Sequence, residues 1–300
     1  MPGAQKGEAE PVHQVRVAAR RLRSTVSLFA PYISAIKPKI TDQQLSWLGH
    51  QAGAVRDLDV LEKLLRKRAK KLDLQISTHL EPLFEDLRLR RAKAAENLAR
   101  VLASRRYKSL VARLSAPIAI TTRSDVAFGS VAGELFAPML KSVTRAGEQM
   151  HEKPTSDDLH HLRKRAKGAR YALETMQAID EKQLGSVLKG LEELQDLVGG
   201  YHDAVLARNW INEFVTSREP GVKVAFASGA LTQAILRDER KLKRRGLKEW
   251  NRFAKIDPER IVKKALEKVQ PKGVSSQRGS SDDAVHHAPR PRRRAHAQGQ

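Results

Sequence analysis

Apolar side chains return every three or four positions along most of the chain, which is the spacing of helices buried on one side. In the stretch that begins at His13, the apolar residues share one arc if each residue turns the helix by about 100°. They are Val15, Ala18, Ala19, Leu22, Val26 and Phe29. No segment alternates apolar and polar residues strictly enough for a β-strand. The pattern therefore predicts an all-α protein with roughly eight or nine helices.

The predicted helices are separated by segments rich in proline, glycine, serine and threonine, which terminate helices. Such breaks fall at residues 30–39, 114–125, 151–158, 216–223 and 255–259. Helix starts are predicted near Pro11 and Pro258, because proline is favoured in the first turn. They are also predicted at Thr41 and Thr155, where the residues have capping-box spacing.

The chain repeats itself at two nearly equal offsets. An offset of 147 residues places His13, Arg16, Arg20 and Arg23 over His160, Arg163, Lys167 and Arg170. An offset of 146 residues places Leu45, Leu48, Gly53 and Asp57 over Leu191, Leu194, Gly199 and Asp203, and Arg91 over Arg237. We therefore predict two related helical halves, at about 11–120 and 121–268, joined near residues 115–126. Residues 1–10 are predicted to form a tail, and the polar, basic residues 269–300 a disordered tail.

The repeated basic residues form a stripe on each helix. With His13 at zero, Arg16, Arg20 and Arg23 fall within an arc of about 80°, turned away from the apolar arc. The second copy has the same arrangement, and the stripe from His13 to Arg23 contains no acid. An ordinary solvated face, the alternative interpretation, mixes charges of both signs because opposite charges one turn apart stabilise a helix. The stripes therefore favour a partner that supplies the negative charge.

The formal net charge of +22 supports that interpretation. The tail from Lys272 onward contributes +4 of it, so +18 belongs to the body. Such an excess attracts polyanions such as nucleic acid, anionic lipid or inorganic phosphate chains. The sequence has no cysteine, no apolar run long enough to cross a membrane and no apolar core of a secretory signal, so we expect a cytoplasmic protein.

Arginine suits phosphate because its planar guanidinium donates two parallel hydrogen bonds and stays charged, and histidine adds a donor. A further basic helix is predicted around Arg237, where Lys241 and Arg244 lie on one side. Asp238 and Glu239 dilute its charge, so a solvated surface and a phosphate site are equally good interpretations there.

Four segments together resemble the CHAD domain, the conserved-histidine α-helical domain, over about residues 11–255. They are VHQVRVAARRLRSTVSLF, AVRDLDVL, LHHLRKRAKGARYALE and LQDLVGGYHDAV. The resemblance implies two pseudo-symmetric antiparallel four-helix bundles around a basic central groove. It also implies non-catalytic binding of inorganic polyphosphate and association with polyphosphate granules. Family members are often fused to a CYTH triphosphatase domain, whose alternating Glu-x-Glu-x-Lys strand is not found here.

The resemblance also implies which residues bind polyphosphate. In the two motifs these would be His13, Arg16, Arg20, Arg21, Arg23, His160, Arg163, Lys164, Lys167 and Arg170. Gly168 stands where the first motif has Arg21. The family usually has a helix before the first histidine motif, so we expect either that the first half lacks a helix or that the start of the chain is misassigned.

No phosphate loop, nucleophile elbow, paired-carboxylate site or metal-ligand spacing stands out, so we expect neither an enzyme nor a cofactor or metal. Asp57 and Asp203 are predicted to be structural, as caps or as partners of an arginine. Two alternatives stay open. One is non-specific binding of nucleic acid, and the other is a scaffold that recruits a phosphate-metabolising enzyme or a granule surface.

Overall fold

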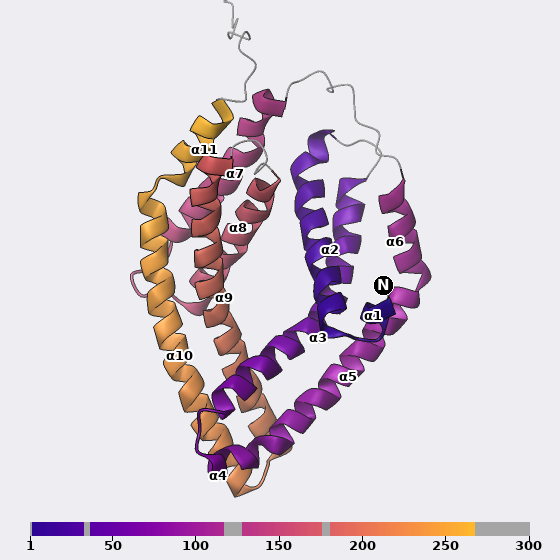
Figure 1. The fold of residues 1–300 in the computed structure, drawn as a ribbon, viewed down its shortest axis with the longest axis vertical. Helices are drawn as coiled ribbons and strands as arrows, with labels where there is room; N and C mark the ends of the chain where they lie inside the picture. The colour runs from indigo at the N-terminus through magenta and orange to yellow at the C-terminus, as the bar shows by residue number, and fades with distance from the viewer. Residues whose placement is uncertain (1, 33–36, 117–127, 176–180, 268–300) are drawn as a thin grey trace, which may run out of the picture. The chain divides into compact units, whose positions relative to one another are not determined.

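The protein is all-α, as the apolar spacing predicted. A computed structural model describes residues 2–32, 37–116, 128–175 and 181–267, and these ranges contain helices and no strand (Figure 1). The predicted junction near residues 115–126 lies largely outside the described residues, and the predicted basic tail lies wholly outside them. The described helices belong to one compact unit, residues 1–270.

Two successive groups of helices make up this unit. The first group contains α1 (Pro2–Gln5), α2 (Ala9–Phe29), α3 (Pro38–Ala69), α4 (Leu74–Ser77), α5 (Glu81–Ala103) and α6 (Arg105–Ser115). The second contains α7 (Phe128–Glu148), α8 (Ser156–Glu174), α9 (Glu181–Arg218), α10 (Val222–Lys255) and α11 (Pro258–Glu267). Two 3₁₀ turns, Ala30–Tyr32 and Thr78–Leu80, complete the description. The estimate of eight or nine helices omitted the short α1 and α4.

Local sequence signals explain most helix starts, with one correction. Thr155 and Asp158 form the predicted capping box of α8, and hydrogen bonds from the Thr155 backbone and His151 lower the pKa of Asp158 to about 2. Helix α11 starts at Pro258, as predicted. The prediction of a start at Thr41 was wrong, because Pro38 already begins α3 and Thr41 is buried inside it. Proline at the first turn outweighed the capping-box spacing.

The N-terminal residues form a packed element instead of the predicted tail over 1–10. Helix α1 lies there, α2 already starts at Ala9, and Ala4 is fully buried in the same core as Val12. Gly7 turns the chain between α1 and α2 with a φ of 72°, and a Cβ at this position would come within 2.8 Å of the side chain of Ala95. Glycine is required here, both for the left-handed backbone and for the close approach.

Three apolar cores hold the helices together. One lies among α1, α2, α3, α5 and α6, and a second mainly among α7 to α11. The third, which we call the shared core, combines the end of α3 and the start of α5 with the end of α9 and the start of α10. Leu65 and Leu83 of the first group and Ile211 and Leu231 of the second are buried in it. The expectation of two bundles did not include a core that belongs to both.

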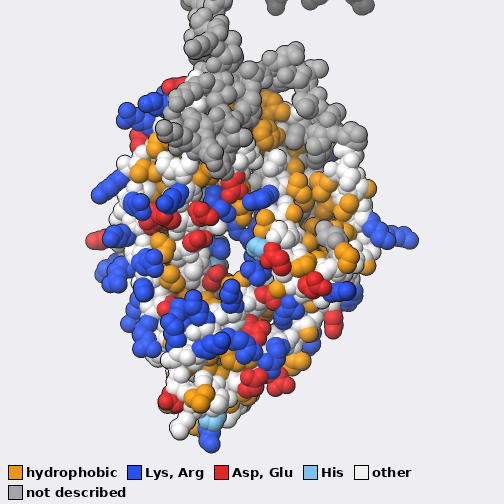
Figure 2. All heavy atoms as spheres, in the orientation of Figure 1, with side chains coloured by type: hydrophobic (Ala, Val, Ile, Leu, Met, Phe, Trp, Pro, Cys, Tyr) orange, Lys and Arg blue, Asp and Glu red, His pale blue; other side chains and the backbone are white. Residues whose placement is uncertain are grey.

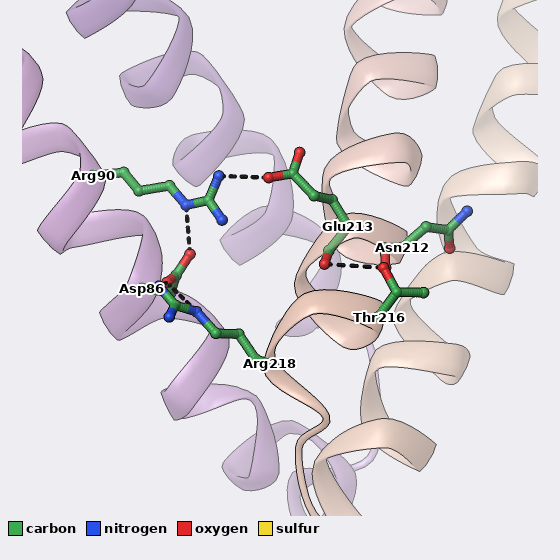
Figure 3. Close-up of polar contacts among 6 residues, drawn as sticks. All are labelled: Asp86, Arg90, Asn212, Glu213, Thr216 and Arg218. Carbon is green, nitrogen blue, oxygen red and sulfur yellow. Dashed lines mark hydrogen bonds and ion pairs between the residues drawn. The ribbon is translucent and has the colours of Figure 1, made fainter.

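An ion-pair network spans the groups beside the shared core (Figure 3). The Asp86 side chain on α5 is only 7% exposed and accepts hydrogen bonds from Arg90 Nε at 2.7 Å and from Arg218 Nε at 3.0 Å. Arg90 also donates to Glu213 of α9 at 2.8 Å. Because Arg218 and Glu213 belong to α9, the network ties α5 to α9 with charge-assisted hydrogen bonds.

Candidate functional site

The two histidine-motif helices, α2 and α8, contact each other across the two groups, and so do α3 and α9. Between these helices lies a pocket of about 390 Å³, which we call the central pocket. Figure 2 shows the surface hollowed in this region, with basic side chains at its rim. Its lining includes Arg16, Asp57, Arg163, His202 and Asp203 at one end, and Leu61, Leu206 and Trp210 at the other. Residues 147 positions apart in the sequence thus line one hollow.

Arg16 reaches the central pocket by crossing α3 at a glycine. A Cβ on Gly53 would lie 3.5 Å from Arg16 Nε, an ordinary contact, so the guanidinium passes close over this position. Arg16 Nη2 lies 2.8 Å from Asp57 Oδ1, one turn further along α3. This ion pair confirms the prediction that Asp57 partners an arginine. Burial lowers the pKa of Arg16, the attraction of Asp57 raises it, and repulsion by Arg20 and Arg163 lowers it again.

Arg163 is placed in the same way on the second group. A Cβ on Gly199 of α9 would come within 3.3 Å of Arg163 Nε. Burial raises the pKa of Asp203, while the positive charge of Arg163 lowers it and the carboxylate of Asp57 raises it. The sequence had aligned both glycines and both aspartates, but it gave no reason for the glycines. The structure supplies a reason at Gly199, where a side chain would crowd Arg163, whereas a side chain at position 53 would be at ordinary contact distance from Arg16.

Lys167 lies at the centre of a group of cations from both motif helices. Its pKa is lowered to about 7, first by burial and then by repulsion from Arg20, Arg163, Arg16 and Arg170. The like charges of these four guanidinium groups disfavour the charged form of Lys167. We call these residues the central cationic cluster: Arg16, Arg20, Arg163, Lys167 and Arg170.

The histidines lie beside this cluster. Nδ1 of His13 is buried and has no hydrogen-bond partner among the described residues. The His160 ring lies 4.7 Å from the ring of His202 on α9. The pKa of His202 is lowered by burial and by the nearby Arg163 and His160. His202 was not among the predicted site residues, although its adjacency to Asp203 in the repeated segment was a usable signal.

Carboxylates from neighbouring helices partly neutralise the stripes. Arg23 is bound by Asp42 of α3 through two hydrogen bonds, of 2.9 and 3.2 Å. Arg170 lies 3.0 Å from Glu174, which also lies 3.6 Å from Arg21 of α2. The expectation of stripes without counter-charges was therefore wrong for these positions and for Arg16. The stripes themselves contain no acid, but α3 and the end of α8 supply acids to them.

The remaining candidates lie elsewhere. Arg91 is bound to Asp59 at 2.5 Å and donates to the carbonyl of Gly7, so it supports the turn after α1. The other candidates are exposed and do not line the central pocket: Lys164, Arg237, Lys241 and Arg244. Asp238 and Glu239, the acids between them on α10, pair with arginines of α3 and α9.

Two further properties concern the described residues alone. They contain no group of three or more histidine, aspartate or glutamate side chains arranged to hold a metal ion. Their helices also include none that is both long enough and apolar enough to cross a membrane.

The comparisons with known proteins define the class. Residues 2–212 match the CHAD domain family, so the chain belongs to that family. The CHAD domain from the plant Ricinus communis is 26% identical, with a TM-score of 0.61, over 80% of this chain and 82% of that one. PptA from Streptomyces chartreusis has the same fold, with a TM-score of 0.66 and 18% identity, over 83% of this chain and 93% of that one.

Two curated relatives are longer than this chain. They are the uncharacterized proteins MT2285 and Rv2226 of Mycobacterium tuberculosis, from strains CDC 1551 and H37Rv. Each is 25% identical over 236 residues, which is 74% of this chain but 44% of the relative. The chain thus spans less than half the length of these relatives.

Proposed function

We propose that this protein binds inorganic polyphosphate without catalysis, in the cleft between α2 and α8, and that it thereby associates with or organises polyphosphate granules. The CHAD family, to which the chain belongs, is linked to polyphosphate binding. The proposed phosphate-binding residues are the central cationic cluster together with His13 and His160. The outer motif residues Arg21, Arg23 and Lys164 contact the polyphosphate where it leaves the cleft.

One observation carries the proposal, namely that α2 and α8 contact each other and that Arg16 of α2 and Arg163 of α8 line one pocket. Burial is the main cause of the lowered pKa of Lys167, and repulsion by four arginines from these two helices adds to it. A bound polyanion would relieve the repulsion, because phosphate oxygens accept hydrogen bonds from several guanidinium groups at once. Since the cluster extends over two helices, a linear chain of phosphates matches it better than a single phosphate does.

The surroundings of the aromatic side chains near the cluster argue against nucleic acid as the main ligand. Tyr171 is 9% exposed, and Lys167 and Arg170 lie 5.9 and 5.2 Å from the centre of its ring. Proteins that bind single strands stack bases on accessible aromatic rings. Tyr171 is therefore not accessible for stacking, and Trp210, at the apolar end of the central pocket, stacks on Phe214 with ring centres 6.0 Å apart. These rings support binding of a phosphate chain that has no bases. Non-specific binding of nucleic acid is the second candidate, and recruitment of a phosphate-metabolising enzyme is a third.

Titration with long-chain polyphosphate at several salt concentrations tests the proposal. We expect binding that weakens steeply with salt, because each neutralised phosphate releases a counterion. Charge reversal in Arg16→Glu/Arg163→Glu should abolish the tight binding, and circular dichroism will show whether this variant is folded. The milder Arg20→Gln should weaken binding and reduce the salt slope by about 1, the value expected for one lost contact.

The matched control is Lys93→Glu/Arg100→Glu on the exposed face of α5, which changes the net charge by the same amount. If the control lowers affinity as much as the cleft variant does, net charge alone explains the binding and the proposed site is wrong. Competition with single-stranded DNA distinguishes the second candidate. Displacement of polyphosphate by DNA at equal phosphate concentration would favour nucleic acid.

A further inference from the structure

A second basic groove lies between α7 and α8. It has a volume of about 320 Å³, within the range of ligand sites. Lys141 and Arg145, one turn apart on α7, line one side, and His161 and Arg165, one turn apart on α8, line the other. We call it the outer groove. None of these four residues belongs to the histidine-motif stripes.

The outer groove lies on a different face of α8 from the central cationic cluster. Arg165 follows Arg163 by two residues, so their side chains leave the helix about 200° apart. Arg163 lines the central pocket and Arg165 lines the outer groove. A ligand in one is therefore separated from a ligand in the other by the body of α8.

The charge of the outer groove is less compensated than that of the central cluster. Its described lining contains no carboxylate, whereas Asp57 and Asp203 line the central pocket. Arg165 Nε donates to His161 Nε2 at 3.3 Å, which holds these two side chains together on α8. Ser142 and Gln149 add polar groups to the α7 side. The groove thus presents two short rows of cations and donors that face each other.

We propose that the outer groove binds a second phosphate chain, so that one protein molecule links two chains. The inference rests on the proposed function only for the chemical class of the ligand. Two facing rows, with Lys141 and Arg145 on α7 and with Arg165 beside the hydrogen-bonding His161 on α8, fit an extended anion that passes between them. The described lining of the groove includes no phenylalanine, tyrosine or tryptophan on which a nucleobase could stack, which favours a chain of phosphates over a nucleic acid.

Two measurements on the full chain test this inference. Isothermal titration with polyphosphate of narrow length distribution should show two binding phases, a tight one for the central cluster and a weaker one for the outer groove. Light scattering with long-chain polyphosphate should rise when protein is added, because a molecule with two sites cross-links the chains. The scattering should fall again in excess polyphosphate, when each site holds a separate chain.

The diagnostic variant is Lys141→Glu/Arg145→Glu, which changes two exposed side chains of α7. We expect it to keep the tight phase, to lose the weaker phase and to reduce the scattering at least fivefold. His161→Gln/Arg165→Gln, on the opposite wall, should act in the same direction. The control Lys93→Glu/Arg100→Glu should behave as the unmodified protein does.

The outcomes separate the two proposals. If Arg16→Glu/Arg163→Glu loses the tight phase and keeps the weaker one, the result supports the proposed function and supports the outer groove as a separate site. A single binding phase in the unmodified protein would overturn the outer groove, as would scattering that falls equally in the α5 control. A second phase seen with single-stranded DNA but not with polyphosphate would replace the inference with a nucleic-acid site.

Discussion

The guanidinium of Arg16 and the carboxylate of Asp57 lie 2.8 Å apart in the central pocket, with Arg16 19% and Asp57 60% exposed. An internal anion therefore already contacts a cation that is proposed to bind phosphate. Asp57 keeps Arg16 in place when the cleft holds no ligand, and it competes with the ligand when one arrives. Asp57 therefore lowers the affinity for polyphosphate but holds the Arg16 guanidinium in a defined position.

Asp57→Asn should therefore bind polyphosphate more tightly than the unmodified protein does. An ion pair with one well-exposed partner contributes about 0.2–1 kcal/mol, so we expect a gain of up to about fivefold. Titration at constant ionic strength measures the change. Asp42→Asn, which frees Arg23 at the outer end of the stripe, provides a comparison. An affinity that falls in Asp57→Asn would mean that positioning of Arg16 outweighs the competition.

Lys167 should make polyphosphate binding depend on pH. Its pKa of about 7 means that the ammonium is charged below this pH and neutral above it in the free protein. A phosphate chain stabilises the charged form, so binding takes up a proton above pH 7 and weakens as the pH rises towards 9. We expect a loss of about tenfold between pH 6 and 9, comparable to one charged hydrogen bond.

Lys167→Arg is the control for this pH dependence, because arginine stays charged throughout the range. Titrations at pH 6, 7, 8 and 9 with both proteins isolate the effect of Lys167, because the histidines contribute to both pH profiles alike. If the two profiles coincide, Lys167 does not titrate in this range and the pH dependence has another origin.

The two glycines beneath the arginines should respond differently to alanine. A Cβ at position 199 would come within 3.3 Å of Arg163 Nε, whereas one at position 53 would lie at 3.5 Å from Arg16 Nε, an ordinary contact. Alanine in a helix is favoured over glycine by about 1 kcal/mol. We expect Gly53→Ala to stabilise the protein by up to about 1 kcal/mol and to leave affinity nearly unchanged. Gly199→Ala should displace Arg163 and weaken binding by about threefold.

Denaturant unfolding and polyphosphate titration on both glycine variants measure these two effects separately. Equal affinities for Gly53→Ala and Gly199→Ala would show that Arg163 moves aside without cost.

Asp86→Ala should destabilise the protein without changing its affinity for polyphosphate. The change removes the buried carboxylate, but Arg218 is 57% exposed and Arg90 keeps Glu213, so the loss of these hydrogen bonds should cost about 1–2 kcal/mol. We expect the midpoint of thermal unfolding to fall by roughly 5 °C. Glu213→Gln, at an exposed carboxylate of the same network, should cost less than 1 kcal/mol. A loss of affinity in folded Asp86→Ala would show that the network also positions the cleft.

Some parts of this molecule follow from sequence and others do not. The spacing of apolar residues predicts the long helices, and the capping box at Thr155 predicts the start of α8, because these signals act over a few residues. The start of α3 was missed because Thr41 and Pro38 give competing local signals. The burial of Ala4 was missed because it depends on packing against helices that lie far along the chain.

The candidate site divides in the same way. Helical geometry places Arg16 and Arg163 on stripes, and the near-equal offsets aligned Gly53 with Gly199. The pairing of Arg23 with Asp42 could not be read from the stripe, since the acid comes from another helix. The outer groove was missed for a related reason, because it needs α7 and α8 to lie side by side before two pairs of basic residues become one site.

The shared core has a consequence for how the repeated halves relate to each other. Leu65 and Leu83 are buried only if Ile211 and Leu231 from the other half pack against them. A fragment that ended between the halves would expose these side chains to water and would lack the Arg218 partner of Asp86. Each repeat thus depends on the other for part of its buried apolar surface, and a gene cut in two should yield fragments that are less stable apart than together.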